Sequence, residues 1–300
     1  MMIYWIKTLI VYTFPAITLI GLVTNSISFA IFSRKRFKNT IFSTYLRCFI
    51  LCQSLNLILP INKMFELNLG THFGLISNFF CKLRYFYAGI NFSNAAWILV
   101  VISIDRFLSI AYPVKFQYRK KTSFQLSICF SVILLNICLS TPAWFYHIAK
   151  RTTTSKISND TSVSCAPYSL WVDIFEILHQ IMIPFVLMFL FTFMMVKYVF
   201  KSRIKTTNFS TSSSNTSSND RKFAISSTTI NIMFLLFNFP HFVMYFFKQY
   251  SNLYQNSLEL FSLLEAFTYF LLYVNLITTF FINYIVNSMF KSEFEIMFNK

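Results

Sequence analysis

Asp105 and Arg106 are the residues whose chemistry most suggests a function, and they stand side by side at the end of a long apolar stretch. Residues 95–104, which precede them, carry no charge. An arginine costs about 2.5 to 3.5 kcal/mol at the centre of a membrane helix and less near its end, and ionisable residues in such segments are candidates for function. The alternative explanation is an arginine that anchors the helix end by snorkelling toward water.

Seven stretches of this chain are long and apolar enough to cross a bilayer as helices. Of the 300 residues, 56% are hydrophobic, 20% aromatic and only 12% charged, which excludes an ordinary soluble domain. A membrane span needs about 20 mainly apolar residues, and as a helix it satisfies its own backbone. The sequence therefore predicts an all-α membrane protein with one seven-transmembrane helix bundle over 1–300. The expected spans are 8–33, 41–62, 78–110, 123–147, 172–198, 223–247 and 258–286.

Basic residues are concentrated on one side of these spans. With the N-terminus outside, 18 of the 26 Lys and Arg lie in inner loops, at inner helix ends or in the tail, and eight lie on the outer side. An excess of Lys and Arg marks the cytoplasmic side of a membrane protein. The sequence predicts an extracellular N-terminus, a cytoplasmic C-terminus and a basic side that meets membrane lipid, with no nucleic-acid partner.

Two of the connections between spans are long, and two of the cysteines lie outside the spans. Residues 148–171 form an expected outer loop with a glycosylation sequon at Asn159, whereas 199–222 form an inner loop that is either a flexible spacer or a phosphorylation segment. Cys81 and Cys165 are the two cysteines predicted at the oxidising outer face, so a disulfide between them is expected. The other four lie within spans, where cysteine behaves as a small hydrophobic residue.

These features, in this order, resemble the rhodopsin-like (class A) G-protein-coupled receptors over essentially the whole chain. No cofactor is expected for this chain, and the resemblance implies that it binds an extracellular ligand and contacts a heterotrimeric G protein through Arg106 at the plasma membrane. The residues that carry the resemblance are Asn25 in the first span, Cys81, Trp97 and the Asp105-Arg106-Phe107 triplet in the third, Tyr112-Pro113 after it, Cys165, Pro184 in the fifth, and Phe234 and Pro240 in the sixth.

Several positions depart from the pattern of the resembled family. Gln53 stands where a sodium-binding Asp is usual and Ala95 where that site has a hydroxyl, so a sodium site of the usual kind is not expected. Asn238 replaces the usual Trp two residues before Pro240. The Asn-Pro-x-x-Tyr motif of the last span aligns either with 279–283, which ends at Asn283, or with 283–287. The first alignment is preferred because it puts Phe290 at the start of a short amphipathic C-terminal helix, which the resemblance implies at 287–298.

Asp220 lies twenty residues before Pro240, at the inner end of the sixth span. Receptors of the resembled family often carry an acid there. We expect Arg106 to pair with Asp105 and Asp220 at rest and to be released when the sixth span moves. A solvated loop acid is the alternative, because Arg221 and Lys222 follow directly. The altered motifs also leave open a receptor that has lost signalling.

The resemblance excludes some ligands and suggests others. Ala88 stands where amine receptors place an Asp, and Tyr273 stands where opsins carry the retinal lysine, so biogenic amines and covalent retinal are disfavoured. Glu265, one helical turn before Tyr269, is the first choice among the outer acids for a basic ligand group. The other candidate pocket residues are Tyr85, His179, His241, Tyr245, Tyr269 and Tyr273, with the further acids Asp173, Glu176 and Glu259.

The overall pattern looks most similar to divergent invertebrate neuropeptide receptors, including those for FMRFamide-like peptides. It predicts a short peptide ligand with a basic, aromatic C-terminus. A chemosensory receptor for small molecules is the nearest alternative, and a channel or transporter would need more polar groups along its spans than Asn25, Gln53, Asn91 and Asn94. An enzyme is not expected, because none of the four His residues has metal-ligand spacing and no nucleophile or phosphate-binding motif occurs.

Overall fold

The structure is a computed structural model, and it describes most of the chain. The residues outside the description are Met1, 39–42, 70–75, 113–120, 156–157, 168–169, 207–214, 251–257 and 299–300. At several helix ends, and over most of a β-hairpin, the backbone is described without the side chains. These segments include Asp220 and Cys165.

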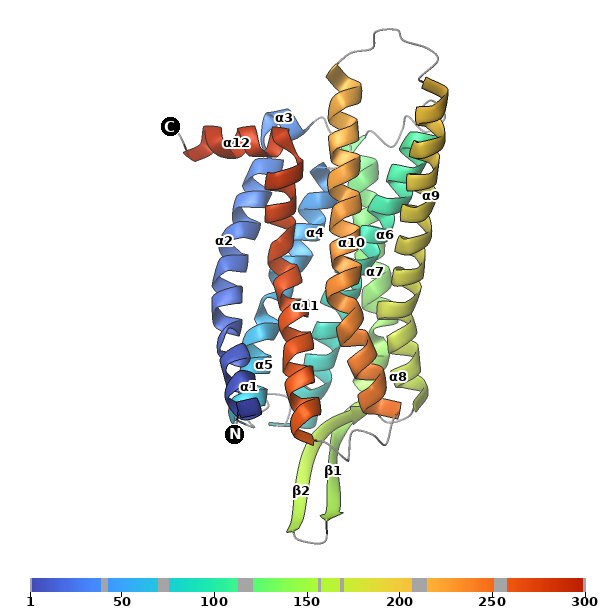
Figure 1. The fold of residues 1–300 in the computed structure, drawn as a ribbon. Coiled ribbons are helices and arrows are strands. Elements are labelled where there is room, and N and C mark those ends of the chain that lie inside the picture. The colour runs from blue at the N-terminus through green and yellow to red at the C-terminus, as the bar shows by residue number, and fades with distance from the viewer. Residues whose placement is uncertain are drawn as a thin grey trace.

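Seven helical spans stand side by side and form a bundle (Figure 1), which confirms the predicted fold class. Each has an apolar surface, as a bilayer requires of a helix that faces lipid. The spans, in order, are α1 (Met2–Tyr12) with α2 (Phe14–Phe32); α4 (Ser43–Asn56) with α5 (Ile58–Leu69); α6 (Asn78–Ala111); α7 (Thr122–Leu139) with the 3-10 turn η3 (Thr141–Phe145); α8 (Leu170–Ile177), the π-helical turn η4 (Leu178–Met182) and α9 (Ile183–Thr206); α10 (Asn215–Tyr250); and α11 (Leu258–Val286).

The connection expected as an outer loop forms a hairpin of two antiparallel strands. Strands β1 (Tyr146–Ser155) and β2 (Ser158–Pro167) pair in register from Tyr146 with Pro167 to Ser155 with Ser158. Thr and Val are frequent in strands because β-branched side chains suit a pleated surface, and both occur in this segment. The hairpin projects from one end of the bundle, and α12 (Ser288–Phe298) lies across the other, beside the short helix α3 (Lys35–Lys38) (Figure 1). We call these the hairpin end and the α12 end.

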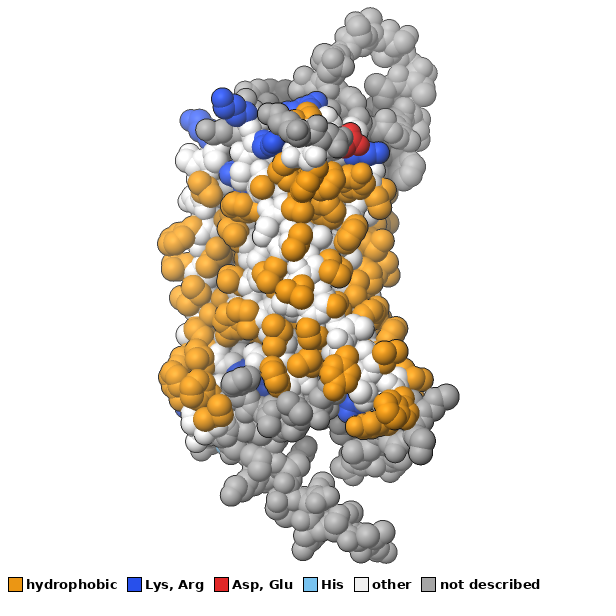
Figure 2. Space-filling view, turned by 90° about the vertical axis from the view of Figure 1, so that its left-hand side faces the viewer, with side chains coloured by type: hydrophobic (Ala, Val, Ile, Leu, Met, Phe, Trp, Pro, Cys, Tyr) orange, Lys and Arg blue, Asp and Glu red, His pale blue; other side chains and the backbone are white. Residues whose placement is uncertain are grey.

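A band of apolar side chains surrounds the middle of the molecule, and Lys and Arg side chains gather above it at the α12 end (Figure 2). Inside the bundle, buried side chains form a large apolar cluster that reaches α12 and a smaller one formed by the first, second and last spans. The helices approach closely at Gly21, where a Cβ atom would lie 2.5 Å from Leu57 Cδ2 and 3.1 Å from Ile277 Cγ2. A small residue there lets α2 pack against α5 and α11.

The inner amphipathic helix expected at 287–298 is present as α12. Asn287 caps it, since its side-chain Oδ1 accepts hydrogen bonds from the backbone N–H groups of Met289 (3.1 Å) and Phe290 (3.3 Å). The buried Phe290 packs against Phe32 of α2, with ring centroids 5.2 Å apart. The cap and this apolar contact fix where α12 leaves the bundle.

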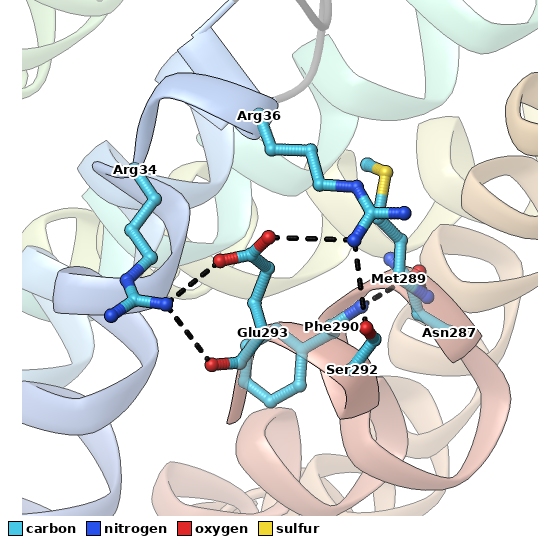
Figure 3. Close-up of polar contacts among 7 residues, drawn as sticks. All are labelled: Arg34, Arg36, Asn287, Met289, Phe290, Ser292 and Glu293. Carbon is cyan, nitrogen blue, oxygen red and sulfur yellow. Dashed lines mark hydrogen bonds and ion pairs between the residues drawn. The ribbon is translucent and has the colours of Figure 1, made fainter. Parts of the chain in front are cut away.

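Glu293 ties α12 to the turn after the first span (Figure 3). Its carboxylate accepts hydrogen bonds from Arg34 Nη1 at 2.8 Å and Arg36 Nη1 at 3.4 Å. Arg34 also donates to the Glu293 carbonyl at 3.3 Å, and Arg36 to Ser292 Oγ at 3.5 Å. Glu293 is itself buried, so its charge is balanced by two guanidinium groups rather than by water.

We predict that Glu293→Gln loosens α12. The amide keeps the shape of the side chain but loses the charge that attracts both arginines, and because these arginines are partly exposed the loss is about 1 kcal/mol. Hydrogen exchange of the α12 amides in nanodiscs measures this as faster exchange. Glu295→Gln, two residues along the same helix and exposed, should leave the exchange unchanged, and equal exchange in the two variants would contradict the interpretation.

Candidate functional site

The pair Asp105 and Arg106 lies inside the bundle near the α12 end of α6. Asp105 is 4% exposed and Arg106 is 3% exposed. Arg106 therefore does not reach the protein surface, as a snorkelling anchor would. The neighbouring Phe107 ring faces Phe191 of α9 at 6.0 Å between centroids. A buried arginine within a membrane span is costly, so this pair is a candidate for function.

The predicted pairing of Arg106 with Asp220 involves a side chain outside the description, although Asp220 is placed in the first turns of α10. The proline of the Tyr112-Pro113 pair also falls outside it. Tyr112 itself ends α6, where its backbone N–H donates to the Leu108 carbonyl at 3.0 Å. The contact between Arg106 and Asp220 thus stays a prediction.

Neutral polar side chains tie α10 to its neighbours one turn from Arg106. Asn231 Nδ2 donates to Ser103 Oγ of α6 at 2.7 Å and, at 3.5 Å, to Thr192 Oγ1 of α9. Ser226 Oγ donates to Asn283 Oδ1 of α11 at 2.8 Å. Such bonds between membrane helices contribute about 0.6 kcal/mol each. The sixth span is therefore held at the α12 end by several weak contacts to three other spans.

Asn283 is completely buried, and its amide links two helices. Its Nδ2 donates to the Thr279 carbonyl at 2.7 Å while its Oδ1 accepts from Ser226. The next residue, Tyr284, instead packs against Phe294 of α12 at 5.3 Å. Asn283 thus faces the interior of the bundle, and its hydrogen bond with Ser226 would be lost if α10 moved away from α11.

A cluster of neutral polar side chains lies in the middle of the bundle, where the resembled family usually has a sodium-binding Asp. Thr279 Oγ1 donates to Gln53 Oε1 at 2.9 Å, and Gln53 Nε2 donates to the Asn275 carbonyl at 3.4 Å. A cavity of about 20 Å³ opens beside them, room for one water, and none of the described residues that line it is acidic. Na⁺ has no carboxylate to balance its charge here, so the residues do not fit a cation site.

The remaining residues that carry the family resemblance lie within the helices. Asn25 is buried in α2, and Phe234 is buried in α10 near Phe92 and Phe185. Pro240 lies inside α10, where it removes one backbone hydrogen bond, and Asn238 Nδ2 donates to the Phe234 carbonyl at 2.6 Å close by. Pro184 follows the π-helical turn η4, since the missing proline N–H disrupts the regular ladder there.

A cavity of about 230 Å³ opens between the helices toward the hairpin end. Five of the predicted pocket residues line it, namely Tyr85, His241, Tyr245, Tyr269 and Tyr273, and Ala88 lines it as well. The lining also includes residues that were not predicted: Asn62, Lys63, Arg84 and Gln180. Glu176 is the described acid on its wall, whereas the side chains of Asp173 and Glu259 are not described.

Lys63 was missed because the predicted second span ended at residue 62 and left it in a loop. In the structure α5 continues to Leu69, which puts Lys63 inside the helix with 5% of its surface exposed. Its Nζ lies 3.3 Å from Glu265 Oε1 and 4.3 Å from the centroid of the Tyr269 ring. Glu265 does not line the cavity but holds the lysine that does.

His179 lies away from the cavity, contrary to its predicted place in the pocket. It is 5% exposed and stacks between Trp97 of α6 (6.0 Å) and Phe175 of α8 (6.2 Å). The Trp97 indole N–H donates to the His179 carbonyl at 3.2 Å. The π-helical turn η4 adds a residue to the helical turn, so His179 faces α6 and the next residue, Gln180, lines the cavity.

The cysteines divide as the sequence suggested, as far as they are described. Cys48, Cys52, Cys129 and Cys138 are free thiols within spans, and Cys81, fully buried at the start of α6, is not among them. Cys165 lies on β2, opposite Ile148 of β1. The Cys165 side chain is outside the description, as is that of Asn159 on the same strand, so disulfide and glycosylation both stay predictions.

This architecture can now be compared with known proteins. Residues 24–279 match the family described as 7 transmembrane receptor (rhodopsin family). The chain belongs to the rhodopsin family of seven-transmembrane receptors. The receptor is also 33% identical over 81 residues to the atypical chemokine receptor 3 of the dog, Canis lupus familiaris. That match covers 27% of this chain and 22% of the relative, so the receptor spans about a fifth of that relative's length.

Membership of this family, with seven apolar spans, makes the receptor a multi-pass membrane protein of the plasma membrane. The residues whose chemistry suggests a function fall into two groups. The cavity with Lys63 and Glu265 lies toward the hairpin end, whereas Asp105 and Arg106 lie near the α12 end. The polar contacts of α10 and α11 occupy the space between them.

We predict that Asn231 and Ser103 are energetically coupled. In a double-mutant cycle with Asn231→Ala and Ser103→Ala, the coupling free energy should be about 0.5 to 1 kcal/mol, because the two side chains share one buried hydrogen bond. The midpoint of thermal unfolding in nanodiscs measures it. Thr229→Ala in place of Asn231→Ala is the control, since the Thr229 hydroxyl donates to Ile225 within α10. Additive effects of Asn231→Ala and Ser103→Ala would contradict the prediction.

Proposed function

We propose that the receptor binds an extracellular ligand, a short neuropeptide, in the cavity toward the hairpin end and activates a heterotrimeric G protein at the α12 end. The observation that carries the proposal is the burial of Arg106, at 3% exposure, one turn from Ser103, which accepts a hydrogen bond from Asn231 of α10. A buried cation beside a movable helix is a site that a partner can uncover. The proposed interface contains Asp105, Arg106, Phe107, Asp220 and Asn283.

The proposed orientation puts the α12 end in the cytoplasm and the hairpin outside. Lys and Arg side chains gather at the α12 end (Figure 2), and cytoplasmic surfaces of membrane proteins carry this excess. The N-terminus would then be extracellular. In this orientation Asn159 faces the compartment where glycosylation occurs, and Cys81 and Cys165 meet oxidising conditions that favour their disulfide.

In the proposed resting state Arg106 pairs with Asp105 and with Asp220 of α10. Ligand binding favours a conformation in which α10 moves outward, and the G protein then meets Arg106. The contacts of Asn231 and Ser226 oppose this movement. Each is worth little in a membrane, so a ligand needs only a modest difference in affinity between the two conformations to shift the population.

The peptide nature of the ligand rests on the cavity and on the pattern of the sequence. Aromatic walls formed by Tyr85, Tyr245 and Tyr269 suit an aromatic side chain. Glu176 is the described acid that lines the cavity, whereas Glu265 lies outside the lining and is paired with Lys63. The likeness to FMRFamide-like peptide receptors favours a peptide, and the matched relative is named as a receptor for chemokines. The second candidate ligand is a small molecule, as a chemosensory receptor would detect, because the cavity is small.

We predict that Asp220→Ala raises ligand-independent signalling of the receptor. Loss of the carboxylate removes the attraction that holds α10 near Arg106, and the active conformation becomes more populated. Basal cAMP or calcium in cells that express equal surface amounts of each variant measures the effect, and a rise of two-fold or more is expected. Asn219→Ala, the neighbouring uncharged position, is the control. Unchanged basal signalling in Asp220→Ala would contradict the proposed pairing of Asp220 with Arg106 in the resting state.

The ligand class is tested by a screen. Cells that express the receptor are exposed to a library of short amidated peptides with basic and aromatic C-termini and, separately, to odorant small molecules. Calcium or cAMP responses to the peptides, absent from untransfected cells, are expected. Responses to odorants with silence toward every peptide would overturn the neuropeptide proposal in favour of the chemosensory one.

A further inference from the structure

We infer that the cavity toward the hairpin end binds the terminal carboxamide of an amidated peptide and that Gln180 is the residue that recognises it. This inference rests on the proposed function, because it assigns a chemical group of the ligand to the same cavity. Two residues on the cavity wall carry neutral amides, Asn62 of α5 and Gln180 of η4. Within the described part of the chain, neither amide forms a hydrogen bond with another residue, so both are open to a ligand.

The charged groups around the cavity balance one another. Lys63 on the wall is paired with Glu265, with Nζ and Oε1 3.3 Å apart. Arg84 and Glu176 lie on the same wall with opposite charges, so the formal charges of these four residues sum to zero. Such a cavity gives a carboxylate no net attraction to offset the loss of its hydration. A carboxamide carries no charge, so the lining favours it as the buried end of a ligand.

The position of Gln180 depends on two local features. In the π-helical turn η4 the helix departs from regular α geometry, so that Gln180 lines the cavity while His179 stacks against α6. On α6, Gly89 leaves room for the glutamine, because a Cβ atom at residue 89 would lie only 2.8 Å from Gln180 Nε2. Gly89 itself lines the cavity, so the Gln180 amide reaches the α6 wall of the ligand site.

A carboxamide complements the side chain of Gln180. Each group has a carbonyl that accepts hydrogen bonds and an NH₂ that donates them, so the two groups can form a reciprocal pair. A methyl ester or a carboxylate has no N–H, and it would leave the Gln180 oxygen without a donor. The cavity of about 230 Å³, smaller than the roughly 300 to 1,000 Å³ of sites for drug-sized ligands, suits the end of a peptide. Its tyrosine walls suit an aromatic residue that carries the amide.

The inference is tested on the purified full-length receptor in neutral nanodiscs, without a G protein. The probes are tripeptides with a basic residue before a C-terminal Phe or Tyr, each prepared as the primary amide, the methyl ester and the free acid. Aromatic primary amides without a peptide bond, and their methyl esters, form a second set. The readout is the dependence of the unfolding midpoint on probe concentration, because a ligand that binds the folded state stabilises it. We expect the amides to bind about ten-fold more tightly than the esters, which share their neutrality, and than the acids.

Variants locate this preference at Gln180. Gln180→Leu removes the amide, so the ratio of amide to ester affinity should fall to about one. Gly89→Ala should do the same while the fold is retained, because its Cβ displaces only the flexible end of the glutamine. The double variant should lower the ratio no further. Ser140→Ala is the matched control, since Ser140 Oγ is also near residue 89 but lies outside the cavity lining, and it should keep the ratio of the natural chain.

The outcomes separate this inference from the proposed function. If the peptide amides bind no better than their esters, or if the preference persists in Gln180→Leu, the inference is wrong while a peptide ligand stands. If the simple aromatic amides bind better than their esters through Gln180 and every peptide is silent, the inference stands and the peptide proposal falls. No stabilisation by an amide of either set overturns the inference.

Discussion

The hydrocarbon of a bilayer offers polar groups no water, so a polar side chain between the helices costs free energy unless another part of the protein hydrogen-bonds to it. This constraint organises the receptor. Amide and hydroxyl groups meet in pairs across the helix interfaces, and many of the pairs involve α6: Asn94 with Asn136 of α7 at 2.8 Å, and Ser103 with Asn231 of α10 at 2.7 Å. The third span is thus the scaffold against which other helices are placed.

The same constraint separates the charges from the neutral interior. Among the described residues that are buried, the charged ones are Lys63, Asp105, Arg106 and Glu293. Lys63 lies toward the hairpin end and the other three near the α12 end. The space between is bridged by uncharged contacts such as that of Gln53 with Thr279. Neutral bonds of small individual energy oppose a movement of α10 only weakly, which is consistent with the proposed activation by movement of this helix.

The sequence predicted those features that depend on a single helix. The seven spans follow from apolar length, and the buried pair Asp105 and Arg106 was recognised because a charge at the end of such a stretch is costly. The helix α12 was expected from the family resemblance. Features that depend on how helices meet were harder to predict. Lys63 was assigned to a loop because a charge normally ends a span, yet Glu265 of α11 compensates it inside the bundle. His179 was assigned to the pocket because it lies toward the outer end of the fifth span, and in the π-helical turn before Pro184 it faces Trp97.

The central claim is that this receptor acts on a G protein through Arg106, and its most direct test is nucleotide exchange with purified components. The receptor in nanodiscs is mixed with each class of heterotrimeric G protein and with the peptides that activate it in cells, and uptake of a GTP analogue is followed for the natural chain and for Arg106→Gln. The account predicts that at least one class exchanges nucleotide faster with the natural chain, and that Arg106→Gln abolishes this acceleration while the fold stays intact. Equal acceleration by both chains, or none with any class, would contradict it.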